Sequence, residues 1–277
     1  MARHRPRHFK TFSEKALMKA LTKAQLTAGS ILLLIAFAAL WQWGPQMLGV
    51  PAYVLPRLSA TVSEAIDMFQ TQNLWMNIGV TALEVVAGFV VGSLLGVVIG
   101  VTLGLSPSTE AMLSPYILAL QIAPKVAFAP LFVMWMGYTV YPKILVAVLI
   151  VFFPVMINVL SAVRSVDPDM VNLVRALSGR RWQVFRFVEF PSAMQALFSG
   201  LRIASTLAVI GVTVGELVGG DRGLGYLLTY GEGQGNTAMV FVSIAGLTLI
   251  GIVAYAAVVL LERRVLHYVP RAAMNMV

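Results

Sequence analysis

The chain has 277 residues, of which 58% are hydrophobic and only 12% are charged, and its mean hydropathy is +0.83. Soluble proteins contain about 45–50% apolar and about 25% charged residues, so a soluble domain of this length could not bury so much apolar surface. The composition therefore excludes a water-soluble enzyme and a disordered chain, and it predicts a membrane protein with several spans. The absence of cysteine excludes disulfides and thiolate metal sites. The three histidines lie near the ends of the sequence, where we expect neither a metal site nor catalysis: His4, His8 and His267.

Six apolar stretches are long enough to cross a bilayer, which takes about 20 apolar residues in helical form. They cover 27–44, 78–105, 111–136, 142–163, 192–218 and 237–261. The charged and proline-containing segment 49–72 is expected to form an external loop with a short amphipathic helix. A second external loop, polar and rich in glycine, is expected at 219–235.

The distribution of Lys and Arg indicates how the spans are oriented. Of the 20 such residues, fifteen lie in the N-terminal segment, in 164–191 or near the C-terminus. Three lie in the connections on the other side: Arg57, Lys143 and Arg222. Cytoplasmic connections collect Lys and Arg, so we expect both termini and 164–191 to be cytoplasmic. The same rule accounts for the net charge of +8 without nucleic-acid binding.

The N-terminal segment 1–26 is strongly basic. Lys15, Lys19 and Lys23 recur every four residues with apolar residues between them, as in a basic helix that lies on the anionic inner leaflet. A solvated charged tail explains the same pattern equally well.

Small residues recur every four positions in two of the predicted spans. In lipid, helices associate by close approach of their backbones, which small side chains permit. We therefore expect packing ridges at Gly88, Gly92, Gly96, Gly100 and Gly104 in one span and at Gly211 and Gly215 in another.

The segment 164–191 carries signals for two short helices. Asp167 can cap a helix whose first residue is Pro168, and Ser178-Gly179 is a typical helix end, which predicts a helix over 168–177. A second helix is expected over 180–190, ended by Pro191. Two short helices joined by a glycine turn would project from the membrane surface and could dock in a groove of another protein.

Several ordered motifs resemble one known family. They are Pro154-x3-Asn158, Ser165-Val166-Asp167-Pro168, Arg181-Trp182-Gln183-Val184-Phe185-Arg186, Pro191, Gly200-Leu201-Arg202-Ile203-Ala204, Gly215-Glu216 and Arg222-Gly223-Leu224-Gly225-Tyr226. They resemble the permease subunits of bacterial binding-protein-dependent ABC importers, of the nitrate, sulfonate, taurine, bicarbonate and pyrimidine-precursor type. The family's Glu-Ala-Ala signature falls on Asn172-Leu173-Val174, and Ser178 takes its Gly position. The chain departs from the signature in this triplet and at the Gly, because Gly179 comes one place late.

The resemblance implies an all-α membrane protein with six transmembrane helices and the type I ABC importer permease fold. Its domains would be a cytoplasmic N-terminus over 1–26, a permease domain over 27–262 with a coupling loop over 164–191, and a cytoplasmic tail over 263–277. The implied residues for coupling to an ATPase are Asp169, Asn172, Leu173, Arg175, Ala176, Leu177, Ser178 and Gly179.

The resemblance further implies a subunit of the bacterial inner membrane without catalysis of its own. It would pair with a second copy of itself, bind two ATP-binding cassette ATPase subunits and receive substrate from an external binding protein. We expect no cofactor on this chain, since it has no phosphate-binding loop, and ATP and Mg would be bound by the ATPase.

Apart from Lys143 at the edge of its span, four charges fall inside predicted spans, where a charge usually faces a cavity or a partner. Lys125 follows Pro124 in the middle of its span, and either lines the substrate pathway or pairs with an acidic group such as Glu216. Glu216 has the same two alternatives. Glu84 is expected at the outer membrane interface, and Arg202 near the cytoplasmic interface, bonded to carbonyl groups.

The substrate class stays open between several small solutes. The segment 124–130 is closer to permeases for heterocyclic organic compounds such as pyrimidine precursors of thiamine, and nitrate, sulfonate, taurine and bicarbonate are the alternatives. An ion-coupled secondary transporter is the competing class. It would show more buried acidic residues and repeated halves, and no repeat is evident.

Overall fold

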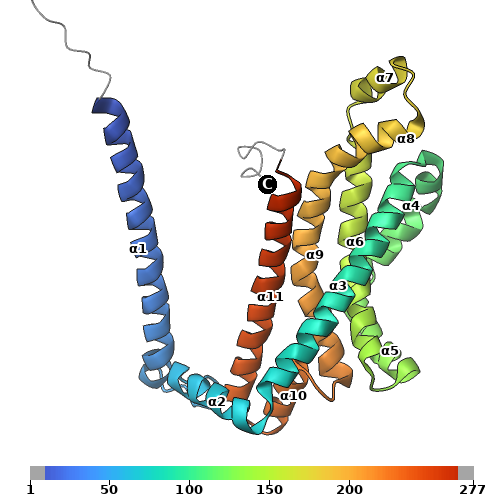
Figure 1. Ribbon diagram of the computed structural model, residues 1–277. Helices are drawn as coiled ribbons and strands as arrows, with labels where there is room; N and C mark the ends of the chain where they lie inside the picture. Colours follow the sequence, from blue (N-terminus) through green and yellow to red (C-terminus); the bar gives the residue numbers. More distant parts are fainter. Residues whose placement is uncertain (1–9, 268–277) are drawn as a thin grey trace, which may run out of the picture. The chain divides into compact units, whose positions relative to one another are not determined.

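The computed structural model describes residues 10–267, with side chains from residue 25 onward except that of residue 168. This part of the chain is helical and contains no strand. Its elements are α1 (Lys10–Met47), α2 (Leu58–Thr71), α3 (Leu74–Gly104), α4 (Pro107–Ile122), the 3-10 turn η1 (Lys125–Phe128), α5 (Ala129–Met136), α6 (Val140–Arg164), α7 (Pro168–Ala176), α8 (Arg181–Val184), the π turn η2 (Phe185–Glu189), α9 (Phe190–Gly219), α10 (Leu224–Gly233) and α11 (Thr237–Val265) (Figure 1).

Five of the six predicted spans correspond to single long helices, and the third corresponds to a bent pair of helices. Helices α1, α3, α6, α9 and α11 are long and apolar enough to cross a membrane, whereas the pair α4 and η1–α5 is bent by 78°. The bend lies at Ala123-Pro124, because the proline ring pushes the preceding residue out of the helical region and Ala123 adopts a ψ of 135°.

The chain divides into two units, Met1–Glu64 and Ala65–Val277. In the first unit, α1 begins at Lys10 and continues without interruption through the first predicted span. The side chain of Trp41 donates a hydrogen bond to the carbonyl oxygen of Pro56, and Gln42 bonds Ser59, so the end of α1 holds the following loop. Residues 1–9, with His4 and His8, and the side chains of Lys15, Lys19 and Lys23 lie outside the described part. The amphipathic N-terminal surface stays a prediction, and the tail 268–277 also lies outside.

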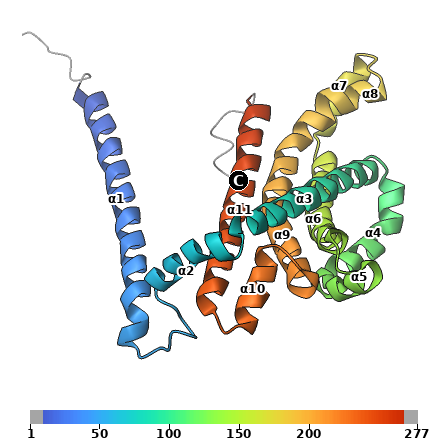
Figure 2. The same ribbon diagram turned by 60° about the horizontal axis from the view of Figure 1, so that its bottom comes forward.

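The second unit is built around α6, which packs along both α3 and α9 (Figures 1 and 2). The five spaced glycines of α3 all face α6, where a Cβ atom would lie within 2.5–2.8 Å of an α6 atom. Gly211 and Gly215 of α9 face α6 in the same way, at 2.6 Å. The backbones approach this closely only because these positions lack side chains.

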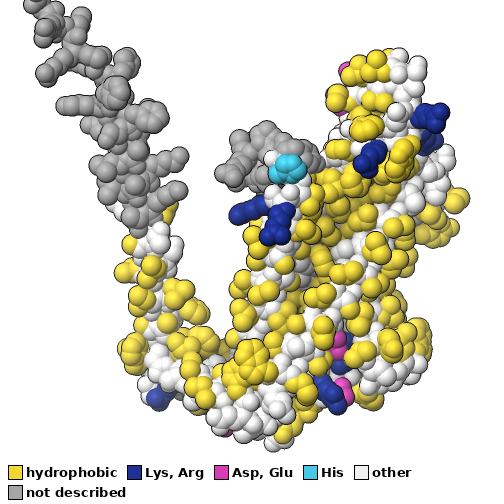
Figure 3. Space-filling model, in the orientation of Figure 1, with side chains coloured by type: hydrophobic (Ala, Val, Ile, Leu, Met, Phe, Trp, Pro, Cys, Tyr) yellow, Lys and Arg dark blue, Asp and Glu magenta, His cyan; other side chains and the backbone are white. Residues whose placement is uncertain are grey.

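The sides of this unit are apolar and its charges gather at the ends. Figure 3 shows hydrophobic side chains along the lengths of the helices, whereas Lys, Arg, Asp and Glu are visible near the two ends. Large apolar side chains such as Leu83, Leu94 and Leu249 are more than half exposed, as expected for helices in contact with lipid.

Two details of the predicted connections are wrong. The sequence predicts a polar loop over 219–235, but this segment contains the ten-residue helix α10, whose Leu224 and Leu227 are buried. Pro191 is predicted to end the second cytoplasmic helix, but α8, η2 and α9 form one continuous helix from Arg181 to Gly219. The π turn directly before Pro191 widens the helix where the proline lacks an N–H group and needs room for its ring.

Candidate functional site

The helix α7 begins and ends with specific capping interactions. The Oδ1 atom of Asp167 accepts a hydrogen bond from the backbone N–H of Asp169 at 2.9 Å, which satisfies one free donor of the first turn. At the other end, the N–H groups of Ser178 and Gly179 donate to the carbonyl oxygens of Arg175 and Val174. This is the Schellman pattern, and the helix stops one residue earlier than predicted, at Ala176.

The left-handed position of this motif is occupied by Ser178, with a φ of 58°. Gly179 is needed for a different reason, because a Cβ atom there would lie 2.6 Å from the carbonyl oxygen of Val174. The chain therefore uses Ser in the strained position and Gly at the close contact, which gives a physical account of the glycine that falls one place late.

The predicted coupling residues lie together on an exposed surface. Gly179 is half-buried, and the other seven are exposed: Asp169, Asn172, Leu173, Arg175, Ala176, Leu177 and Ser178. Met170, Leu173 and Leu177 follow each other at helical spacing and are 51%, 56% and 77% exposed. An apolar stripe of this kind on a projecting helix is suited to docking in a groove.

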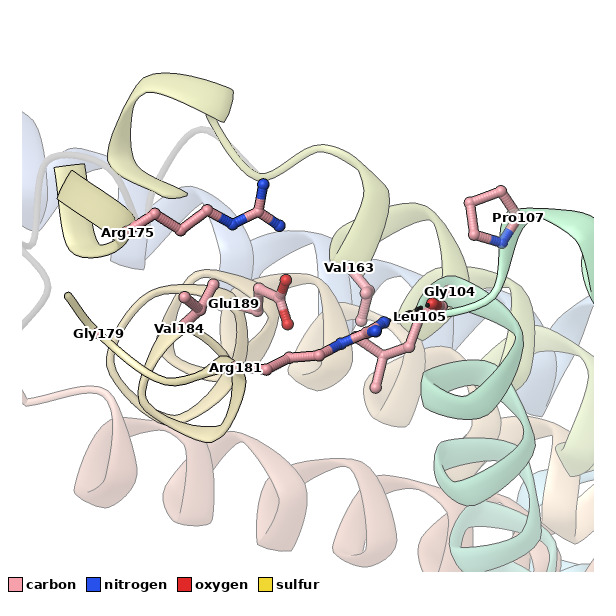
Figure 4. A pocket seen from close by; sticks show the side chains of 9 residues that line it. All are labelled: Gly104, Leu105, Pro107, Val163, Arg175, Gly179, Arg181, Val184 and Glu189. Atoms are coloured by element: carbon pink, nitrogen blue, oxygen red, sulfur yellow. Dashed lines mark hydrogen bonds between the residues drawn. The ribbon is translucent and has the colours of Figure 1, made fainter. Parts of the chain in front are cut away.

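A cavity of about 370 Å³ lies between the α7–α8 segment and the turn that joins α3 to α4 (Figure 4). The side chains of Arg175, Arg181 and Glu189 point into it (Figure 4). The guanidinium of Arg181 also donates a hydrogen bond of 3.2 Å to the carbonyl oxygen of Leu105, the residue after α3.

Lys125 lies at the break in the third span and borders a second cavity of about 410 Å³. Its ammonium group donates to the carbonyl oxygens of Gln121 and Ala123, which the break leaves without helical partners. The ammonium is also 4.8 Å from the centre of the Phe153 ring, a cation–π contact. Asn158 lines the same cavity.

Glu216 is buried near the C-terminal end of α9, where it holds the start of α10. Its Oε1 accepts from the hydroxyl of Thr81 at 2.7 Å, and its Oε2 accepts from the N–H of Gly225 at 2.6 Å. Thr81 in turn accepts from the N–H of Leu224, and Asn77 accepts from that of Gly223. We call Asn77, Thr81 and Glu216 the loop anchor. The alternative that paired Lys125 with Glu216 is not realised within the described part of the chain.

One ion pair corrects an expectation about charge. The sequence assigns Lys143 to an external connection, but this residue lies in α6 and is buried against Glu84, with the two side chains 3.2 Å apart. Lys143 also lies 3.9 Å from Asp221. The position of Glu84 at the membrane interface stays a prediction. Lys143 falls in the first turn of α6. Gly215 of α9 leaves room for it, since a Cβ atom on Gly215 would lie 2.6 Å from the Cα atom of Lys143.

Arg202 is expected from the sequence to bond carbonyl groups. It is instead paired with Glu262 of α11, at 3.5 Å.

Sequence reasoning missed Lys143, Thr81 and Asn77. A carboxylate such as Glu84 inside a span requires a cationic partner. That signal could have identified Lys143, the basic residue at the start of the fourth predicted span. Thr81 and Asn77 carry no comparable signal, because uncharged polar side chains in a helix are common.

Comparison with known proteins decides the family. The model of the family described as binding-protein-dependent transport system inner membrane component matches residues 88–267, which include α7, both cavities, Lys143 and Glu216. The chain belongs to this family. Its members are non-catalytic permease subunits of ABC transporters, and the chain is accordingly an ABC importer permease for a small solute.

Relatives of this permease cover most of its length. It is 37% identical to the riboflavin transport system permease protein of Chloroflexus aurantiacus over 86% of the chain and 88% of that relative. It is 31% identical to the formylaminopyrimidine transport permease protein of Halalkalibacterium halodurans, over 86% and 94%. It is 30% identical to the putative aliphatic sulfonates transport permease protein of Bacillus subtilis, over 86% of each.

The fold of the permease also matches a solved structure. The crystal structure of an amino acid ABC transporter with histidines superposes with a TM-score of 0.58 at 16% identity, over 72% of this chain and 97% of the other. The prediction of an all-α type I importer permease fold is thereby confirmed.

Proposed function

We propose that this permease works as a homodimer in the bacterial inner membrane, with both termini and residues 164–191 in the cytoplasm. Two ATPase subunits dock on the exposed apolar stripe of α7, and they bind the ATP and Mg. An external binding protein delivers substrate near Asp221–Gly225, which lies at the opposite end of α9 from α7. The observation that carries the proposal is the family match over 88–267, which includes a projecting helix with three exposed apolar side chains.

The proposed pathway passes the cavity at the break in the third span. A helix break is tolerated at membrane depth where it faces protein or a water-filled cavity, and this one supplies a cation, an aromatic ring and an amide side by side. These groups suit a planar heterocyclic solute with polar substituents. The riboflavin and formylaminopyrimidine permeases among the relatives support this class.

A sulfonate is the second candidate, because Lys125 offers a single positive charge and a putative sulfonate permease is 30% identical. Glu216 has a different role in this proposal. It holds the outer turn through the loop anchor, so it stabilises the external end of the pathway without contacting the solute.

Uptake into liposomes tests this proposal. The permease is reconstituted with its ATPase and binding protein, and uptake of riboflavin, formylaminopyrimidine and an alkanesulfonate is compared. Lys125→Met is expected to lower uptake about tenfold or more, since a hydrogen bond to a charged group contributes about 1.5–3 kcal/mol. Basal ATP hydrolysis and dimer stability should stay near normal, and Lys125→Arg should retain part of the uptake.

Two results would contradict the proposal. Full uptake by Lys125→Met would show that this residue has no role in the pathway. ATP-independent uptake driven by an ion gradient would contradict the ABC importer mechanism and favour a secondary transporter.

A further inference from the structure

The cavity beneath α7 has the features of an anion site, and two of its lining residues, Arg175 and Gly179, also belong to the predicted coupling residues. Its lining brings together three separate parts of the chain: the α3–α4 turn, the end of α6, and the α7–α8 segment. Arg175 and Arg181 direct their guanidinium groups into it from two different helices, and Glu189 directs its carboxylate into it (Figure 4). Two positive charges and one negative charge leave a net charge of about +1.

The charged groups of this cavity are available to a ligand. Among the side chains that the structure describes, none forms an ion pair with Arg175, Arg181 or Glu189. Arg181 uses one N–H on the carbonyl oxygen of Leu105, and a guanidinium has five N–H donors in total. Arginine side chains recognise phosphate through paired N–H groups, so two of them on one cavity favour a phosphate oxyanion.

The cavity lies at the ends of the α3 and α6 spans. Leu105 directly follows the last residue of α3, Pro107 begins α4, and Val163 lies at the end of α6. The helix that carries Arg181 and Glu189 also carries exposed aromatic side chains: Trp182 is exposed by 65%, Phe187 by 66% and Phe190 by 45%. Exposed aromatic residues at the ends of spans are typical of the headgroup region of a bilayer.

We propose that this cavity binds the headgroup of an anionic phospholipid such as phosphatidylglycerol. The phosphodiester contacts the guanidinium groups of Arg175 and Arg181, and the headgroup hydroxyls donate to Glu189. Basic pockets between transmembrane helices commonly bind lipid headgroups in this way. The assignment to the inner leaflet rests on the orientation proposed above, whereas the binding itself does not.

A bound headgroup would connect α7 to the body of the permease. In the structure, a hydrogen bond from Arg181 to Leu105 joins α8 to the end of α3, next to the cavity. A phosphate between Arg175 and Arg181 would add contacts on both sides of this gap and hold α7 in a fixed position. We therefore expect the lipid to increase the fraction of ATP hydrolysis that is stimulated by substrate.

Native mass spectrometry of the purified transporter tests the binding directly. The protein is exchanged into detergent with phosphatidylglycerol, phosphatidylethanolamine or phosphatidylcholine, and lipid adducts are counted. Arg175→Gln or Arg181→Gln is expected to weaken the phosphatidylglycerol adduct about fivefold, and the double variant about thirtyfold, because each such cation contributes about 1 kcal/mol. The matched control is Arg180→Gln with Arg186→Gln, two exposed arginines of the same segment that do not line the cavity.

A second variant separates the site from general charge. Glu189→Gln removes the negative charge but keeps an oxygen that can accept from the headgroup hydroxyls, so binding of phosphatidylglycerol should increase. Its preference over phosphatidylethanolamine should also increase, because the ammonium of phosphatidylethanolamine loses an opposite charge. Equal loss of adducts in the control pair and in the cavity pair would overturn the proposal, since it would show only a basic surface. Displacement of the adduct by inorganic phosphate would assign the cavity to a free cytoplasmic anion in place of a lipid.

Coupling is measured separately in nanodiscs. Nanodiscs with phosphatidylglycerol are expected to give a higher ratio of substrate-stimulated to basal ATP hydrolysis than those with phosphatidylcholine alone. Arg181→Gln should lose this difference, and Arg181 lines the cavity without being one of the predicted coupling residues. Lipid adducts in native mass spectra without any transport activity would leave this site standing while contradicting the proposed function. Transport activity without adducts that depend on the cavity residues would contradict the lipid site and leave the proposed function standing.

Discussion

At the scale of single residues, the region where α3, α6 and α9 meet α10 depends on buried polar contacts. Lys143 and Glu84 form an ion pair in which both side chains are nearly inaccessible, and the loop anchor holds three consecutive N–H groups at the start of α10. A buried charge that loses its partner is strongly destabilising, whereas removal of both charges is often tolerated. This asymmetry makes the pair testable.

Lys143→Met alone should lower stability by about 3–5 kcal/mol, because it leaves Glu84 buried without its partner. Glu84→Gln should cost less, because Lys143 keeps Asp221 as a neighbour at 3.9 Å. The double variant should recover most of this loss. The melting temperature of the purified protein in detergent measures the effect, and the exposed Glu232→Gln serves as control. Additive losses in the double variant would contradict a direct interaction between the two charges.

The end of α7 offers a test in which two neighbouring positions respond in opposite ways. Ser178→Gly should stabilise the turn by about 1 kcal/mol, since a non-glycine residue in the left-handed region is strained. Gly179→Ala should open it, because the new Cβ would collide with the carbonyl oxygen of Val174. Hydrogen exchange at the backbone amides of positions 178 and 179 in each variant reports both effects. Faster exchange in Ser178→Gly would contradict the assigned geometry.

At the scale of elements, contact between α3 and α6 depends on small residues. A Cβ at Gly96 would lie 2.8 Å from the backbone carbonyl oxygen of Phe152, an atom that cannot move without moving α6. Gly79, in the same helix, has nothing within 4 Å of the corresponding position. The two glycines therefore differ in packing although they belong to the same helix.

Gly96→Ala should destabilise the protein by about 1–3 kcal/mol through overpacking, whereas Gly79→Ala should be neutral or slightly stabilising. The measurement is again the melting temperature in detergent. An equal response of the two variants would show that helix propensity, and not the approach of α6, determines the effect.

The same elements show what the sequence can and cannot predict. The spacing of the α3 glycines predicts their packing face, because the periodicity belongs to one helix. The partner of Glu84 is 59 residues away and begins a helix, so a count of charges along the chain places Lys143 in a loop. Helix α10 is missed because its glycines and polar residues favour a loop, whereas Leu224 and Leu227 gain burial only from tertiary contacts.

At the scale of the whole molecule, the orientation in the membrane follows from charge and is open to a direct test. The chain has no cysteine, so single cysteines can be introduced at Arg180 and at Arg222 without a background. A thiol reagent that does not cross membranes should label position 222 in intact cells and position 180 only after lysis. Labelling of position 180 in intact cells would reverse the proposed topology.

The uninterrupted connection of α8, η2 and α9 has a mechanical consequence. At 1.5 Å per residue, the 30 residues of α9 form a rod of about 45 Å, with the α7–α8 segment at one end and Glu216 near the other. A rigid tilt of about 5° about one end of such a rod displaces its far end by about 4 Å, which follows from its length alone. That displacement exceeds the 2.6 Å between Glu216 and the Gly225 N–H, so a tilt of this size by α9 relative to α10 would break the hydrogen bond without unfolding any helix.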